Sequence, residues 1–170
     1  KTSIKFFNSI EAGDDINEAL YDLQSSNNIF STLSSLKLIQ KNNNQNNFSI
    51  SNEMYKELIL SSELNDLFRS SIAIHASYTL INASYVENSL KYKNDILIFI
   101  DNINDDLESY YSIKNELKYL LLVTEIDINK LEYKNQKEAK EMFKDIFNSS
   151  LISPSVKERV KKIHEFQIYK

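Results

Sequence analysis

The chain has 170 residues and a net charge of −4, with one Gly, one Pro and no Cys. This length suits a single domain over residues 1–170 with a sizeable core, and the absence of Cys excludes disulfides, thiolate metal sites and cysteine nucleophiles. So few Gly and Pro residues leave little material for the tight turns of β-rich folds, which predicts an all-α protein. The negative net charge argues against a nucleic-acid partner.

The first part of the chain predicts one helix and one loop. Apolar residues recur at helical spacing from Ile16 to Leu36, so we expect a helix that ends near Lys41. The next segment, Lys41 to Asn47, reads KNNNQNN and has nothing to bury, which predicts a polar loop. Ser51 then offers an N-cap for the following helix.

The central stretch from Ser51 to about Lys93 contains no Gly and no Pro and predicts one unusually long helix. A mostly apolar seam with alternating steps of four and three runs along it, through Leu60, Leu64, Leu67, Ser71, Ile74, Tyr78, Ile81 and Tyr85. A second row lies one helical position further along and includes three polar residues. A helix that buries both rows would place a polar row in or near the core, made of Ser71, His75, Thr79 and Asn82.

A second seam with the same spacing begins at Ile96 and predicts another long helix, which ends near Ile126. A loop over residues 127–134 and an amphipathic helix over 135–147 follow. The chain breaks near Ser149–Pro154 and restarts with Ser153 as N-cap and Pro at the first helical position. These segments, each with one apolar stripe, predict a four-helix bundle with long helices and a broken last helix, without an internal repeat.

Neither histidine predicts a catalytic or metal site. The helical neighbours of His75 include hydroxyls but no carboxylate, and His164 is expected to be solvated. Asp101 and Asp105 share a helical face, but no Glu is followed by His three residues later, as a di-metal bundle would require. We therefore expect no catalytic residue, no cofactor and no bound metal, and predict that the protein is not an enzyme.

Two groups of residues allow both a structural and a functional interpretation. The polar row is either a set of hydrogen-bonded layers that fix helix register, or the mark of a marginally stable bundle that opens toward a membrane or partner. The last helix carries a candidate basic surface, which is either a solvated face or a contact for anionic lipid or an acidic partner. This surface consists of Lys157, Arg159, Lys161 and Lys162.

Composition and pattern together suggest a resemblance. Asn, Ile and Lys are favoured, as in AT-rich genomes, and KNNNQNN at Lys41 to Asn47 is a typical spacer. With the cysteine-free helical pattern and the polar residues between Ser70 and Asn88, the chain resembles the SPECT-type cell-traversal proteins of malaria-parasite sporozoites. That resemblance implies a protein secreted from micronemes that helps sporozoites to cross host cells and acts at membranes after partial opening, without catalytic residues.

A second resemblance is to the helical surface lipoproteins of Borrelia, which implies binding of a host plasma protein. We therefore expect a secreted or cell-surface, non-enzymatic helical protein that acts in host-cell traversal or membrane interaction. Its partner would be the host-cell membrane or a host or parasite protein. The alternative is a surface adhesin that binds a host protein through a fixed helical face.

Overall fold

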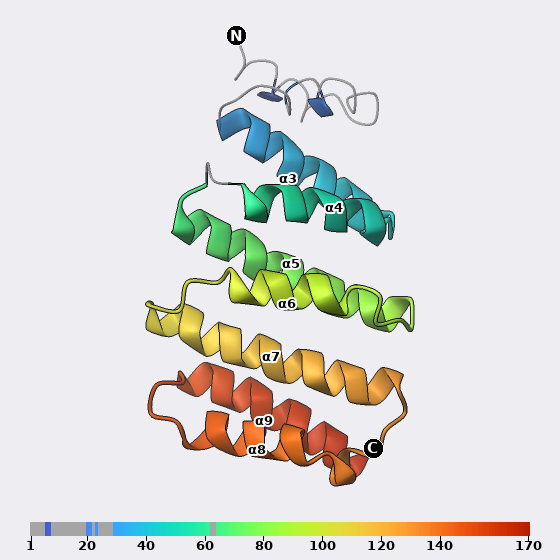
Figure 1. Cartoon of the computed structure of the whole chain (residues 1–170), viewed down its shortest axis with the longest axis vertical. Helices are drawn as coiled ribbons and strands as arrows, with labels where there is room; N and C mark the ends of the chain where they lie inside the picture. Colours follow the sequence, from blue (N-terminus) through green and yellow to red (C-terminus); the bar gives the residue numbers. More distant parts are fainter. Residues whose placement is uncertain (1–5, 8–19, 22, 24–28, 62–63) are drawn as a thin grey trace. The chain divides into compact units, whose positions relative to one another are not determined.

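The computed structural model describes residues 6–7, 20–21, 23, 29–61 and 64–170. From residue 29 onward the described chain is helical and has no strand (Figure 1). The elements are α3 (Ile29–Asn44), α4 (Phe48–Leu60), α5 (Asp66–Val86), α6 (Lys93–Asp101), α7 (Glu108–Ile128), the 3-10 helix η2 (Tyr133–Asn135), α8 (Lys137–Asn148) and α9 (Pro154–Tyr169).

The prediction of an all-α fold is confirmed, but the predicted four-helix bundle is not. Seven α-helices occupy the described chain from Ile29 onward, in place of four long ones. The sequence predicts one domain, and the structure divides the chain into two compact units, Lys1–Leu58 and Ile59–Lys170. The part of the first predicted helix that precedes Ile29 lies mostly outside the described residues.

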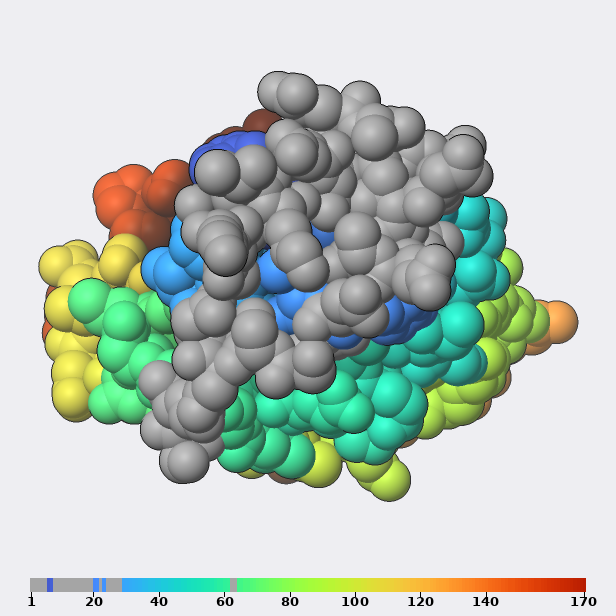
Figure 2. All heavy atoms as spheres, turned by 90° about the horizontal axis from the view of Figure 1, so that it is seen from above, coloured from blue at the N-terminus to red at the C-terminus, as the bar shows by residue number. Residues whose placement is uncertain are grey.

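In the first unit, α3 and α4 pack against each other through a short turn. Asn43 Nδ2 donates to the Tyr55 hydroxyl at 3.2 Å, and Ser51 Oγ donates to the Ile39 carbonyl at 3.5 Å. In Figure 2 the atoms of α4 lie beside those of α3. The predicted polar loop over 41–47 is largely wrong, because α3 continues to Asn44 and α4 begins at Phe48, whose ring is buried.

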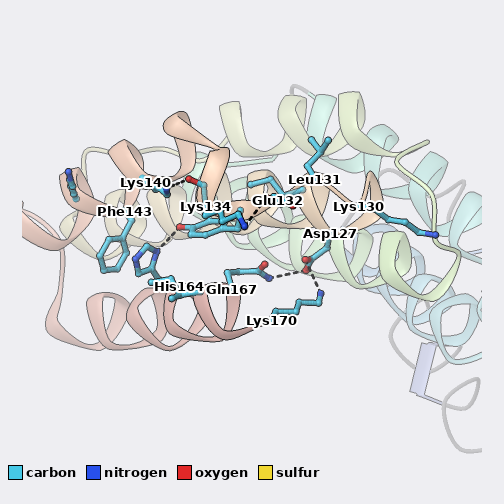
Figure 3. A pocket seen from close by; sticks show the side chains of 14 residues that line it. Asp127, Lys130, Leu131, Glu132, Lys134, Lys140, Phe143, His164, Gln167 and Lys170 are labelled. Atoms are coloured by element: carbon cyan, nitrogen blue, oxygen red, sulfur yellow. Dashed lines mark hydrogen bonds and ion pairs between the residues drawn. The ribbon is translucent and has the colours of Figure 1, made fainter.

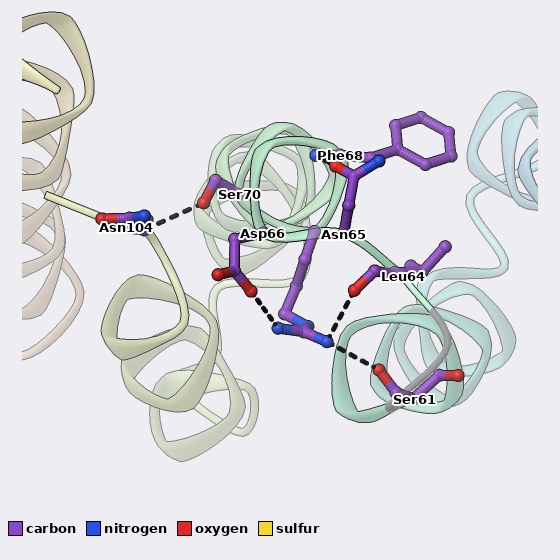
Figure 4. A network of polar contacts seen from close by, with 8 residues as sticks. Ser61, Leu64, Asn65, Asp66, Phe68, Ser70 and Asn104 are labelled. Atoms are coloured by element: carbon purple, nitrogen blue, oxygen red, sulfur yellow. Dashed lines mark hydrogen bonds and ion pairs between the residues drawn. The ribbon is translucent and has the colours of Figure 1, made fainter. Parts of the chain in front are cut away.

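The predicted long central helix is wrong, because the chain breaks between α4 and α5. Asn65 caps α5 by accepting a hydrogen bond from the Phe68 N–H at 2.9 Å (Figure 4). Arg69 then donates to the carbonyls of Ser61 and Leu64 at 3.0 and 2.9 Å. Side chains thus replace the backbone hydrogen bonds that a continuous helix would make, so a break costs little here.

The second predicted long helix is also interrupted, at residues 102–107 between α6 and α7. This segment is rich in Asn and Asp, which favour turns, and Asn104 Oδ1 accepts from the Asp106 N–H at 3.0 Å. Lys114 Nζ reaches back from α7 to the Ile103 carbonyl at 3.2 Å. Ile103 is still buried, so the apolar spacing marked a core residue correctly although its backbone is not helical.

In the second unit, α5, α7 and α9 lie side by side in one layer (Figure 1). The helix α6 packs against both α5 and α7, and α8 packs against both α7 and α9. The core around α7, α8 and α9 is apolar and includes Tyr119, Val123, Ile126, Tyr133, Ala139, Ile146, Ile152, Val156 and Val160. As predicted, α8 and α9 are separate helices, and Pro154 opens α9.

The sequence predicts no internal repeat, and this prediction is wrong, because the helices repeat with a period of 42 residues. α5 and α7 both contain 21 residues, and their first residues are Asp66 and Glu108. Left-handed residues follow α3, α5 and α7 at Asn46, Asn88 and Lys130, with φ of 58°, 48° and 55°. Two-helix repeats of about 40–47 residues are a known class of helical-repeat protein, in which each repeat stacks on its neighbours.

Each of these three helices ends in the same hydrogen-bonded motif. After α7, the Leu131 N–H donates to the Ile126 carbonyl at 2.9 Å and the Lys130 N–H donates to the Asp127 carbonyl at 3.1 Å. The equivalent bonds after α5 come from Ser89 and Asn88, at 2.9 and 3.2 Å. These are Schellman caps, which satisfy the last carbonyls of a helix and turn the chain.

Candidate functional site

The predicted buried polar row is not buried. Ser71, His75 and Asn82 are exposed and Thr79 is half-buried. Neighbouring atoms still shield His75 partly from water, and this desolvation lowers its pKa.

The buried polar residues of α5 are instead Ser70, Ser77 and Ser84, each fully enclosed. Ser77 and Ser84 donate to carbonyls one turn back, at 2.8 and 2.9 Å, and Ser70 Oγ accepts from the Asn104 N–H at 2.9 Å. A small side chain that is satisfied in this way fits between α5 and the two helices that pack on it. The prediction failed because it placed the larger residues of α5 inside.

The candidate basic surface on α9 is partly neutralised within the protein. Arg159 makes two hydrogen bonds to the buried carboxylate of Glu116 on α7, at 2.7 and 2.5 Å. Lys161 lies 3.9 Å from Glu165 on the same helix, whereas Lys157 and Lys162 make no ion pair within the described residues. Arg159 therefore serves first to attach α9 to α7, and the four residues do not act as one basic patch.

A second polar cluster joins α5, α7 and α9 near their ends. Asp127 accepts from the Tyr85 hydroxyl at 3.0 Å, from Gln167 Nε2 at 3.0 Å and from Lys170 Nζ at 2.9 Å. The Asp127 side chain is only 11% exposed, so these donors take the place of water around it. This cluster separates two hollows on either side of α9.

The larger hollow is a pocket of about 840 Å3 between the end of α7, η2, α8 and α9 (Figure 3). Its wall is apolar along much of its length and its rim carries lysines. The lining residues are Ile126, Asp127, Lys130, Leu131, Glu132, Tyr133, Lys134, Lys140, Phe143, Lys144, His164, Gln167, Ile168 and Lys170. We refer to it as the C-terminal pocket.

One end of this pocket is aromatic. The His164 ring stacks on Phe143 with centroids 3.6 Å apart and planes inclined by 3°. His164 Nδ1 lies 2.5 Å from the Tyr133 hydroxyl, which lies 2.8 Å from the Tyr119 hydroxyl. The prediction that His164 is solvated is therefore wrong, because α8 and η2 bring an aromatic ring and a hydroxyl to it from elsewhere in the chain.

The protonation of this group follows from its surroundings. Burial lowers the pKa of His164, and the positive charge of Lys140 lowers it further against the opposing effect of Glu165. Burial also raises the pKa of Tyr133, so its hydroxyl keeps its proton at neutral pH. A neutral imidazole that accepts from Tyr133 at Nδ1 carries its proton on Nε2.

The charges that line the pocket are unequal. Both carboxylates have partners, since Asp127 binds three donors and Glu132 lies 3.1 Å from Lys134. Lys130, Lys140 and Lys144 have no ion pair with a carboxylate in the described part of the chain, although Lys140 donates to the Lys134 carbonyl. The pocket therefore has an excess of positive charge available to a ligand.

The chain beyond α7 is basic although the whole chain is acidic. Residues 129–170 contain ten Lys or Arg and six Asp or Glu, in a chain with a net charge of −4. Large apolar side chains are exposed in the same region, with exposed fractions of 46% at Leu131, 63% at Phe166, 56% at Ile168 and 88% at Tyr169.

These apolar residues lie in the connection after α7 and in the last turns of α9, on both sides of that helix. Leu131 and Ile168 line the pocket together with Lys130. Phe166 lines the smaller hollow with Lys162 and Lys170, and Lys170 Nζ lies 5.6 Å from the centre of its ring. We refer to these four apolar residues with Lys130, Lys134, Lys162 and Lys170 as the C-terminal edge. Lys134 and Lys170 pair with Glu132 and Asp127, whereas Lys130 and Lys162 have no ion pair in the described part of the chain. Exposed apolar side chains of this size beside unpaired lysines are typical of an interaction surface.

Other kinds of site receive no support. No group of three His, Asp or Glu residues that could hold a metal ion occurs among the described residues. Within the same residues, no helix is long and apolar enough to cross a membrane. Comparison of the chain with protein-family models, with curated proteins and with solved structures gives no match. The candidate site therefore rests on its own geometry.

Proposed function

We propose that this protein is a non-enzymatic helical-repeat protein that binds to anionic membrane surfaces through its C-terminal edge. The observation that carries the proposal is the combination of exposed apolar residues with a local excess of positive charge. Leu131, Phe166, Ile168 and Tyr169 are all at least 46% exposed, and lysines lie beside them. Apolar side chains enter the boundary of a bilayer, and each nearby Lys adds about 1 kcal/mol of attraction to anionic lipid.

This mode of binding differs from the mechanism expected from the sequence. Partial opening of the bundle would require a polar core, and the row that suggested it is exposed at Ser71, His75 and Asn82. The C-terminal edge offers apolar surface without any opening. Host-cell traversal, secretion and a micronemal location stay predictions that rest on the resemblance to sporozoite cell-traversal proteins.

The experiment is co-sedimentation of the protein with vesicles of phosphatidylcholine, with and without phosphatidylserine. We expect binding that requires phosphatidylserine and weakens as salt rises, because salt screens the lysines. Phe166→Ser combined with Tyr169→Ser should weaken binding about tenfold or more, since it removes two side chains that enter the lipid.

Leu151→Ser is the matched control. Leu151 is 60% exposed, close to the value of Phe166, but it lies in the connection before α9, at the opposite end of that helix. Equal losses in both variants, or equal binding to vesicles without phosphatidylserine, would contradict the proposal. If the protein binds no vesicles but binds one protein from serum, the result would favour the adhesin alternative instead.

A further inference from the structure

The C-terminal pocket has a shape and a charge that the proposed membrane contact does not use. Its volume of about 840 Å3 lies within the range of about 300–1,000 Å3 that small-molecule sites occupy. It lies wholly within the second unit, among α7, η2, α8 and α9.

The apolar part of the pocket is extended. Phe143 and His164 form one end, and Leu131 lies away from them (Figure 3). Ile126 in the last turn of α7 and Ile168 in the last turn of α9 also line the pocket. A ligand that covers this length must have an apolar body. Leu131 and Ile168 are half exposed at the mouth, so burial of their side chains by a ligand would be favourable.

The polar groups of the pocket select the charge of that ligand. Lys130, Lys140 and Lys144 have no carboxylate partner among the described residues, whereas Asp127 and Glu132 are both occupied by donors. The pocket therefore offers cations and N–H donors, but no vacant carboxylate for a cationic ligand.

We propose that the C-terminal pocket binds a single-chain anionic lipid, with a carboxylate or monophosphate headgroup held by lysines of α8 and the chain along the apolar wall. A fatty acid and a lysophosphatidate both have one apolar chain and an anionic headgroup, as the shape and charge of the pocket require. These shared properties define the ligand class. The pocket opens at the C-terminal edge. Only the inference that the lipid comes from a membrane rests on the proposed function. Binding itself requires no membrane.

The test uses the whole chain in solution, without vesicles, and measures binding of oleate and of oleoyl lysophosphatidate by calorimetry below their micellar concentrations. We expect one site per chain for at least one of these two lipids. Monooleoylglycerol, which has the same chain but no charge, should bind at least tenfold more weakly. Inorganic phosphate and acetate, which have the charge but no chain, should not bind measurably.

The location is tested with lysine variants. Lys140→Gln combined with Lys144→Gln should weaken binding about tenfold or more, because both cations line the pocket. Lys137→Gln is the control, since Lys137 lies on the same helix but is 87% exposed and does not line the pocket. Phe143→Trp adds the only tryptophan of the chain, and its fluorescence should be quenched by a brominated fatty acid.

The results separate the two proposals. If neither anionic lipid binds, if monooleoylglycerol binds as tightly, or if Lys137→Gln weakens binding as much as the double variant, the pocket assignment is wrong. Soluble lipid binding by a chain that does not sediment with vesicles would support the pocket and refute the membrane contact. Vesicle binding that persists in the Lys140→Gln and Lys144→Gln variant, together with lost oleate binding, would support both.

Discussion

Replacing Arg159 by Ala should destabilise the protein because it leaves a buried carboxylate without its main partner. Glu116 is 3% exposed on α7, and Arg159 holds both of its oxygens from α9, at 2.7 and 2.5 Å. Truncating one member of a buried ion pair costs about 3–5 kcal/mol, chiefly because the remaining charge keeps its desolvation penalty.

The structure reduces this value. The Arg159 side chain is 49% exposed, so water can enter when it is removed, and the Tyr78 hydroxyl also interacts with Glu116. We therefore expect the free energy of unfolding to fall by about 2–3 kcal/mol. For a chain of this length, that corresponds to a decrease in melting temperature of about 5–10 °C.

The assay is urea unfolding followed by far-ultraviolet circular dichroism, with Lys161→Ala as the control. Lys161 lies on the same helix, and its pair with Glu165 is exposed and 3.9 Å long, so its loss should cost less than about 0.5 kcal/mol. Adding Glu116→Gln to Arg159→Ala should restore part of the stability, because a neutral amide is less costly to bury than a carboxylate. Equal effects of Arg159→Ala and Lys161→Ala, or no recovery in the double variant, would refute this reasoning.

Two further predictions concern α5 and His164. Ser77→Ala should change the free energy of unfolding by less than about 0.5 kcal/mol because the hydroxyl bonds only within its own helix, whereas Ser77→Leu should cost about 1–3 kcal/mol by overpacking. Chemical unfolding tests this, and the exposed Ser71→Leu should cost less than Ser77→Leu if the row is assigned correctly. The lowered pKa of His164 means that the unfolded chain binds a proton more readily, so the free energy of unfolding should fall as pH decreases through about 6.5. The test measures unfolding at pH 7 and pH 5.5 in a His75→Gln background, which removes the similar contribution of His75. His164→Phe should make the free energy of unfolding fall less between these two pH values. An unchanged pH dependence would contradict this prediction.

The fold class could be predicted from the sequence, but the helix count could not. Low Gly and Pro content and the apolar seams indicated helices correctly, and Ser153 with Pro154 marked the start of α9. The breaks before α5 and α7 contain neither Gly nor Pro in the described residues, and they depend on contacts from Arg69 and Lys114. Apolar spacing continued across both breaks because residues such as Ile103 stay buried outside a helix.

The candidate site could be predicted only in part. The basic character of the last helix was visible, but the partner of Arg159 is 43 residues away on α7 and depends on how the helices pack. The C-terminal pocket combines residues of α7, η2, α8 and α9 that no local spacing connects. A signal did exist in the charge, since residues 129–170 are basic in an acidic chain, and division of the sequence by charge would have revealed it.

The repeat explains why the pocket lies beside α8 and α9. With the period of 42 residues, Leu122 of α7 corresponds to His164 of α9. A polar ring thus replaces an aliphatic side chain at this position. The connection between paired helices also lengthens, from residues 87–92 after α5 to residues 129–136 after α7, and the longer connection supplies Lys130, Leu131 and Tyr133 to the pocket. The helical caps keep the backbone in register from one repeat to the next while the side chains and the connections differ, so a pocket forms beside the longer connection after α7.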